Sequence, residues 1–345
     1  MSLQTRAAAL QRRVVLPEAD DPRTLDAVEL MVRGQLVQPL LVGNRERLER
    51  ALSERGLDPS HVEVWDPAST GRTLAAELAD RGLDLDLIGG AERFDDPLWL
   101  GVGLVSAGHA DGCVAGAVHS TPDVIRAALR VVGKAPGIQT VSSAFYMDLH
   151  RREDASEHSG APGASGPLTF TDAGVVPDPS AEQLAEIAMG AARARARIVG
   201  DEPRVAFLSY STSGSSTGPG VQKVQEALEI FRTAMPEVLA DGELQADAAL
   251  IPGVRQRKAP NSPLEGSANV LVFPNLDAGN IAYKLVQRLA GAVALGPVLQ
   301  GLSKPVHDLS RGASAEDIVL VSCIAALEAE GSDTPSGEGA EAPSA

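Results

Sequence analysis

Short apolar segments alternate with amphipathic segments along this chain, and that alternation constrains its fold more than any other feature. Residues 13–18, 38–44 and 62–65 predict short buried strands. The intervening residues 24–32 and 45–55 predict helices, the first preceded by Asp residues that suit a helix cap. A β-α-β-α order predicts a mostly parallel sheet whose connections are right-handed crossovers.

The same order continues almost to the end of the chain. Polar Gly, Ser and Pro residues fill 151–167 and mark a loop or a junction between two domains. We expect 331–345 to be a disordered acidic tail, because it holds acidic residues without basic ones. Further strands are predicted over 112–116, 204–209 and 269–273, and further helices over 74–81, 98–108, 221–235, 278–289, 318–327 and from the 177–183 turn to 199.

The composition argues against several classes of function. The chain has 30 Lys and Arg against 46 Asp and Glu, so it lacks the basic excess that nucleic-acid binding requires. Cys113 and Cys323 form no CxxC pair, which predicts reduced thiols and no zinc site. The sequence has neither a leader-like N-terminus nor a run of about 18 apolar residues. We therefore expect a cytoplasmic protein without a membrane partner.

Small polar residues follow the predicted strand at 112–116. Open α/β sheets bind their ligands at the carboxyl ends of their strands, which is the position of these residues. His119, Ser120 and Thr121 precede a predicted helix that carries Arg126 near its start. Backbone N–H groups, hydroxyls and a guanidinium at such a place suit a phosphate dianion. An ordinary Ser/Thr helix cap explains the same residues, and the pattern alone favours this cap.

Two further polar loops allow a functional and a structural interpretation. Residues 209–218 carry many hydroxyl groups, which can line an anion site or form an ordinary surface loop. Ser310 and Arg311 lie in a tight turn before the last helix, and Asp317 lies where that helix begins and can act as a base. A cap by Ser314, with Asp317 complementing the helix dipole, explains the acidic residue without catalysis and is favoured by the pattern alone.

The usual cofactor fingerprints are missing. Gly101 and Gly103 lack the third glycine of a dinucleotide-binding loop, and no P-loop pattern occurs. We therefore expect neither nicotinamide nor P-loop chemistry, no resident cofactor and no metal.

Several ordered blocks of sequence resemble one known family, the phosphate acetyltransferases (phosphotransacetylases), across roughly residues 13–327. The blocks are DGCVAGAVHST at 111–121, PDPSAEQLA at 177–185, DGELQ at 241–245 and DLSRG at 308–312, with KAP, ANVL, GNI and GP in order between the last two. The chain resembles the short form of the family, without an N-terminal regulatory region.

The resemblance implies a reaction and the residues that perform it. Family members transfer an acetyl group reversibly between acetyl phosphate and coenzyme A, by direct attack of the thiol in a ternary complex, with coenzyme A as a substrate. Carried over to this chain, Asp317 takes the thiol proton, Ser310 hydrogen-bonds the thiol or the developing charge, and Arg311 holds the phosphoryl group. The implied substrate-binding residues are Ser120, Thr121, Arg126, Lys258, Tyr283 and Arg81.

The resemblance also implies a fold and an assembly. The family has two α/β/α domains with mostly parallel sheets, like isocitrate and isopropylmalate dehydrogenases, and an active-site cleft between them. For this chain it implies a first domain of residues 1–148 and 297–330, a second domain of 149–296, and a homodimer. The alternatives are a phosphate butyryl- or propionyl-type acyltransferase and a non-catalytic paralogue that binds coenzyme A or acyl phosphate.

Overall fold

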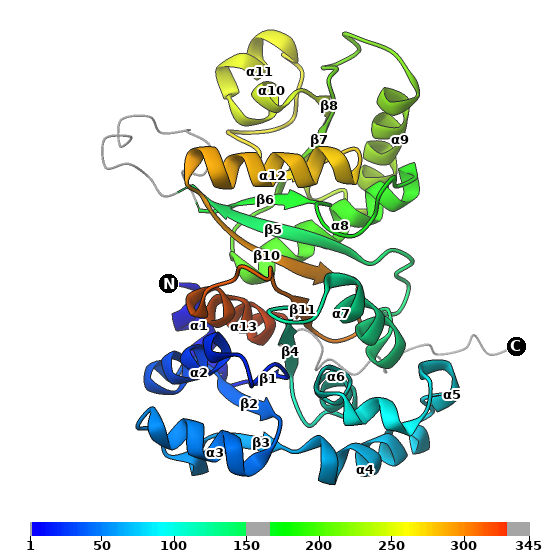
Figure 1. The fold of residues 1–345 in the computed structure, drawn as a ribbon. Coiled ribbons are helices and arrows are strands. Elements are labelled where there is room, and N and C mark those ends of the chain that lie inside the picture. The colour runs from blue at the N-terminus through cyan, green and yellow to red at the C-terminus, as the bar shows by residue number, and fades with distance from the viewer. Residues whose placement is uncertain (1, 150–165, 330–345) are drawn as a thin grey trace, which may run out of the picture.

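The computed structural model describes residues 2–149 and 166–329, and its strands form two sheets, one above the other in Figure 1. The predicted junction loop at 151–167 falls outside the described residues except for its last two positions. The predicted tail at 331–345 falls wholly outside them. The α/β fold with mostly parallel sheets is confirmed.

Neighbouring strands of the first sheet all run parallel. Because β4 pairs with both β1 and β11, segments remote in sequence end at one edge of this sheet, and the loops that follow them meet there. In spatial order the strands are β11 (Val306–Asp308), β4 (Gly112–Ala115), β1 (Arg13–Leu16), β2 (Gln38–Val42) and β3 (Glu63–Trp65).

Helices cover both faces of the first sheet, because successive side chains of a strand point to opposite faces. Val14 and Leu16 pack into one core, and Val15 between them packs into the other. On the first face lie α1 (Leu3–Leu10), α2 (Pro22–Gly34), α3 (Arg45–Glu54) and α13 (Ala315–Ala329), and on the second α4 (Pro67–Asp80), α5 (Leu85–Ile88), α6 (Pro97–Ala107) and α7 (Thr121–Ala127).

The second sheet is mixed: β5 is antiparallel to both of its neighbours, and the remaining pairs are parallel. In spatial order its strands are β10 (Val293–Gln300), β5 (Ser142–Asp148), β6 (Leu168–Thr171), β9 (Val270–Val272), β7 (Arg204–Leu208) and β8 (Leu239–Leu244). One face packs against α8 (Ala181–Ile198) and α9 (Pro219–Ala234), and the other against α10 (Ala246–Leu250), α11 (Pro252–Lys258) and α12 (Leu276–Ala290).

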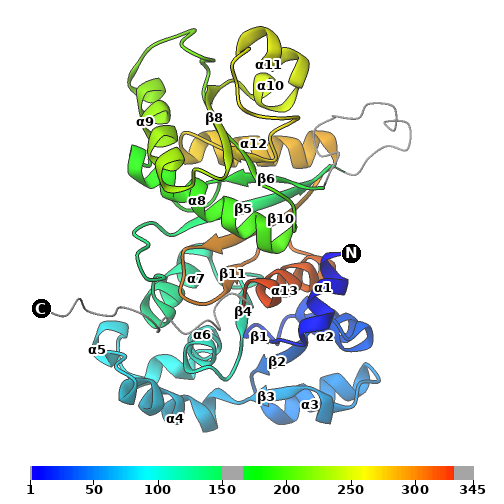
Figure 2. The ribbon, with the colours of Figure 1, turned by 180° about the vertical axis from the view of Figure 1, so that it is seen from behind.

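Helix α13 links the two layered units. It packs on the first sheet, and its Ile324 also joins a small core with Ala194 of α8 and Val298 of β10. Figure 2 shows α13 just below α8 and β10. This double contact explains why α13 is apolar on nearly all its faces, as a helix buried on all sides must be.

The division into domains stays a prediction, and the strand pairing differs from it at two places. Strand β5 stands at the end of the predicted first domain, and β10 straddles the predicted boundary at 297, yet both belong to the second sheet. Backbone pairing between these distant segments decides their place, and the apolar pattern along the chain does not encode that pairing.

Arg195 of α8 is a buried charge that connects several segments of the second unit. Its guanidinium is 1% exposed, donates to the carbonyls of Pro167 (2.7 Å) and Asn269 (3.0 Å), and pairs with Asp201 (2.7 Å). Replacement by Met should lower the free energy of unfolding by about 3 kcal/mol, because these partners lose their donor. Arg193→Met, on the exposed face of the same helix, should change it by less than about 0.5 kcal/mol.

Chemical denaturation of both variants measures this difference. Equal stability of the two variants would contradict the assigned role of Arg195.

Candidate functional site

A cavity of about 450 Å³ lies between the two sheets, next to the carboxyl ends of β4 and β11. It brings together five predicted site residues: Ser120, Thr121, Tyr283, Ser310 and Arg311. Loops of the first sheet contribute Gly116, His119, Ser120, Thr121, Pro122, Leu309, Ser310 and Arg311, and the second unit contributes Phe145, Ala173, Gly174, Asn280, Tyr283, Lys284 and Pro297.

Glu18, just after β1, organises the loop that follows β4. Its buried carboxylate accepts hydrogen bonds from the backbone N–H groups of Ala117 (2.7 Å), Val118 (3.0 Å) and His119 (2.7 Å), and from Nδ1 of His119 (2.8 Å). Burial raises the pKa of Glu18, but the hydrogen bonds outweigh it and hold this pKa below its usual value. The hydrogen bond to Glu18 raises the pKa of His119.

Asp308, the last residue of β11, joins its strand to the same loop. Thr121 donates its hydroxyl to Oδ2 of Asp308, whose side chain is fully buried. Burial raises the pKa of Asp308 to about 7. Gly116 passes so close that a Cβ there would lie 2.6 Å from the backbone nitrogen of Leu309, and its φ of +107° also favours glycine.

Ser310 and Arg311 lie exposed in the turn after β11. Arg23 of α2 holds this turn, since its Nη1 donates to the carbonyls of Arg311 (2.7 Å) and Ala313 (2.9 Å). Nη2 of Arg23 donates to the carbonyl of Ala117 (3.0 Å) and so connects the two loops of the first sheet. Arg311 itself lines the cavity.

Asp317 stands outside the lining residues of the cavity. Its carboxylate accepts the backbone N–H of Ser314 (2.9 Å), and the Ser314 hydroxyl accepts the backbone N–H of Asp317 (3.2 Å). This reciprocal pair is the capping arrangement that the pattern alone favoured. The helix start thereby fixes the carboxylate six residues after Arg311, and its role as a base stays a prediction.

Ser120 and Arg126 both contact Asp123 on α7. The Ser120 hydroxyl donates to Asp123 (2.5 Å), and Arg126 pairs with the other oxygen of that carboxylate (2.7 Å). Arg126 lines an adjoining hollow of about 480 Å³, which shares Thr121 and Gly174 with the first cavity.

The other predicted binding residues lie in different surroundings. Tyr283 lines the cavity and stacks on Phe145, with ring centroids 3.9 Å apart. Lys258, on α11, pairs with Asp247 at 2.7 Å. Arg81 lies at the end of α4 and donates to the carbonyl of Ala107 at 2.7 Å. Neither Lys258 nor Arg81 is among the residues that line the cavity, and their binding roles stay predictions.

The hydroxyl-rich segment 209–218 folds around a buried carboxylate of its own. Glu243 of β8 accepts the hydroxyl of Ser211 (2.7 Å) and the backbone N–H of Gly214 (2.9 Å). Gln225 of α9 donates to the second oxygen of Glu243 (2.7 Å). The structural interpretation therefore accounts for the hydroxyl of Ser211.

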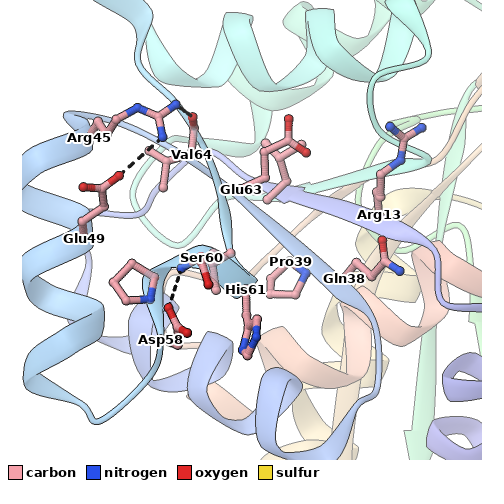
Figure 3. Close-up of a pocket in the computed structure, with 13 residues that line it drawn as sticks. Arg13, Gln38, Pro39, Arg45, Glu49, Asp58, Ser60, His61, Glu63 and Val64 are labelled. Carbon is pink, nitrogen blue, oxygen red and sulfur yellow. Dashed lines mark hydrogen bonds and ion pairs between the residues drawn. The ribbon is translucent and has the colours of Figure 1, made fainter.

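A larger hollow, of about 630 Å³, lies at the opposite edge of the first sheet, where β1, β2 and β3 begin (Figure 3). Three of its polar side chains have partners within the hollow: Arg45 pairs with Glu49 (3.4 Å) and donates to the backbone carbonyl of Val64, and Asp58 accepts the backbone N–H of Ser60 (2.9 Å). Ligands of parallel sheets bind at the carboxyl ends of strands, so the smaller cavity is the candidate site.

Three residues of the site escaped prediction from the sequence: Glu18, Arg23 and Asp308. Glu18 and Asp308 stand at or just after strand ends, which is a signal that could have identified them. Nothing in the sequence indicates that Arg23 bridges two loops.

Among residues 2–149 and 166–329, no group of three or more His, Cys, Asp or Glu side chains could hold a metal ion. Within the same residues, no helix combines the length and the apolar character needed to cross a membrane.

Comparisons with known proteins give one consistent result. The model of the phosphate acetyl/butaryl transferase family matches residues 1–326. The chain is 42% identical to a phosphate acetyltransferase of Thermoanaerobacterium thermosaccharolyticum, over 95% of this chain and 98% of that protein. It is also 42% identical to one of Treponema pallidum, over 96% and 98%.

A solved structure agrees with these sequences. A phosphotransacetylase from Streptococcus pyogenes superposes with a TM-score of 0.84 at 38% identity, over 95% of this chain and 97% of that one.

The raised pKa of Asp308 predicts how stability varies with pH. The unfolded chain releases this proton near the usual aspartate pKa of 3.8 and the folded protein near about 7, so ionisation opposes folding as the pH rises between these values. Asp308→Asn removes the ionisation. The variant should gain stability over the wild type across this interval, by at most about 4 kcal/mol, since one pKa unit is worth about 1.4 kcal/mol.

Urea unfolding of both proteins at about pH 4 and about pH 8 measures the change. A stability difference that is the same at both pH values would contradict the raised pKa of Asp308.

Proposed function

The chain belongs to the phosphate acetyl/butaryl transferase family and catalyses the reversible transfer of an acetyl group between acetyl phosphate and coenzyme A; we propose that this transfer takes place in the cavity between its two sheets. The observation that supports this location is the meeting of Ser120, Thr121, Ser310 and Arg311 at the ends of adjacent parallel strands. The Ser310 hydroxyl and the Arg311 guanidinium supply donors that a phosphoryl group needs, whereas Ser120 and Thr121 donate their hydroxyl protons to Asp123 and Asp308 in this structure.

In the proposed reaction Asp317 takes the proton of the coenzyme A thiol. A thiol with a pKa of about 8.5 is mostly protonated at neutral pH, so a positioned carboxylate raises the fraction of reactive thiolate. The thiolate attacks the carbonyl carbon of acetyl phosphate, and the bond from that carbon to the bridging oxygen breaks. Ser310 hydrogen-bonds the thiol or the charge that develops, and Arg311 holds the phosphoryl group.

The remaining binding roles follow from position. Arg126 lines the hollow that adjoins the cavity, where it suits an anionic part of either substrate. Tyr283 and Phe145 form an aromatic wall beside the cavity, which suits the small apolar acetyl group. Coenzyme A enters as a substrate, and no resident cofactor takes part in the proposed steps.

We further propose that the enzyme is a cytoplasmic homodimer. Cys113 and Cys323 are buried free thiols, which suits a reducing compartment. Ile281, Leu285 and Leu289 are 57%, 52% and 82% exposed and follow one another at four-residue spacing on α12, which forms an outer face of the second unit in Figure 1. A second copy, placed by a two-fold axis, would cover this apolar stripe with its own.

Asp317→Asn tests the role of the base. The amide oxygen can still accept the N–H of Ser314, so the helix cap survives, but the side chain can no longer take a proton. We expect kcat for acetyl-CoA formation from acetyl phosphate to fall by about 10²- to 10⁴-fold. Glu316→Gln, which removes the same charge one residue away, is the matched control and should retain activity.

Thioester absorbance follows the reaction, with butyryl phosphate assayed in parallel. Full activity of Asp317→Asn would exclude this base, and faster turnover of butyryl phosphate by the wild type would overturn the acetyl preference.

Leu285→Glu tests the proposed dimer surface. A charge in the middle of the stripe should convert the dimer to a monomer in sedimentation velocity, because burying an unpaired carboxylate is costly. Leu87→Glu, at a leucine on α5 that is 63% exposed, should leave the dimer intact. A monomeric wild type, or a dimeric Leu285→Glu, would contradict the proposal.

A further inference from the structure

We propose that His119 is the general acid that protonates the departing phosphate, and that Glu18 is the positioning residue that holds its imidazole for this task. The proposal rests on the acetyl transfer described above and adds to it the group that supplies the second proton. It assigns a role to a carboxylate–histidine pair that the three implied catalytic residues leave unused.

The chemistry of the leaving group creates the need for such an acid. Acetyl phosphate is a dianion near neutral pH, so breaking its bond to the acetyl carbon without proton transfer would release phosphate as a trianion. That trianion is a strong base and a poor leaving group. A proton delivered to the bridging oxygen as the bond breaks releases the stable dianion.

His119 has the position for this transfer. Its side chain lines the cavity together with Ser120, Thr121, Ser310 and Arg311, the groups that suit the phosphoryl group. Its Nδ1 donates to Glu18 at 2.8 Å, which leaves Nε2 to act on a ligand. The imidazole is about one quarter exposed, so a substrate in the cavity can reach it.

Glu18 is fixed more firmly than the histidine it orients. Its side chain is 3% exposed, and three backbone N–H groups from the loop after β4 bind its two oxygens. The carboxylate therefore cannot swing away when a substrate binds. An imidazole held in this way keeps one tautomer and one orientation.

Three carboxylates, each from a different part of the fold, face His119. Glu18 follows β1, Asp96 precedes α6 with its carboxylate 4.0 Å from Nε2, and Asp123 lies on α7. Arg311 and Lys284 are cations that share the cavity. The hydrogen bond to Glu18 and the negative charges of the three carboxylates raise the pKa of His119, so the imidazolium persists to higher pH than that of an ordinary histidine.

The step balances in protons and electrons. The thiol gives its proton to Asp317, the thiolate sulfur forms a bond to the acetyl carbon, and the electron pair of the carbon–oxygen bond goes to the bridging oxygen. That oxygen takes the proton from Nε2 of His119, which becomes neutral. In the reverse direction neutral His119 removes a proton from the phosphate dianion as it attacks acetyl-CoA.

The test compares two substrates in the full-length enzyme. Acetyl methyl phosphate expels methyl phosphate, which leaves as a dianion without needing a proton. His119→Gln keeps a hydrogen-bond donor but cannot release a proton. We expect its kcat with acetyl phosphate to fall by about 10²- to 10⁴-fold, and its kcat with acetyl methyl phosphate to stay within a few-fold of the wild type.

His109→Gln is the matched control, since His109 contacts Glu77 at 2.9 Å at a place away from the cavity. It should leave both rates unchanged. Equal losses of His119→Gln with both substrates would overturn the acid role and indicate a structural one. A wild type that forms no acetyl-CoA would instead refute the proposed reaction itself.

The pH dependence of the reaction distinguishes a positioning role of Glu18 from a purely structural one. In the wild type, the forward kcat/KM should fall at high pH as His119 loses its proton. Glu18→Gln removes the anion that raises the pKa of His119, so this fall should move to lower pH. An unchanged pH profile in Glu18→Gln would contradict its positioning role.

Discussion

The buried carboxylate of Glu18 is the contact on which the candidate site depends. A parallel sheet ends its strands at one edge, so Glu18 after β1 reaches the backbone of the loop after β4. Three N–H groups of that loop converge on it, and such a buried anion is stable only while they do. The loop that carries His119, Ser120 and Thr121 therefore has one conformation before any substrate arrives.

The turn after β11 is fixed to the same loop by two other contacts. Thr121 donates to the buried Asp308, and Arg23 donates to carbonyls in both segments. Gly116 permits this close approach because a side chain there would meet the backbone of Leu309. The loops that follow β4 and β11 thus form one side of the cavity, and the second sheet and α12 form the other, so its shape depends on how the two units pack.

Much of the architecture could be predicted from local pattern. Apolar periodicity located α2, α3 and the strands β1 and β2, and the Ser180–Gln183 pair that begins α8 forms the capping box its sequence indicates. Strands β5 and β10 could not be read this way, because polar residues and a Gly-Pro step interrupt their apolar pattern. Lys258 and Arg81 show the same limit for function: the resemblance implied a binding role for each, and the structure shows each bonded to a local partner and outside the lining of the cavity.

The sequence by itself determined the α/β class, the order of most elements and the family, because these depend on residues close together in the chain. Ser310 and Arg311 were identifiable for the same reason, within one short block. Only the tertiary structure decided that Glu18, His119 and Asp308 meet, since their strands pair across large separations in sequence. Their hydrogen bonds exist only once the sheet has formed, and so do the raised pKa of His119, which follows from its hydrogen bond to Glu18, and the raised pKa of Asp308, which follows from burial.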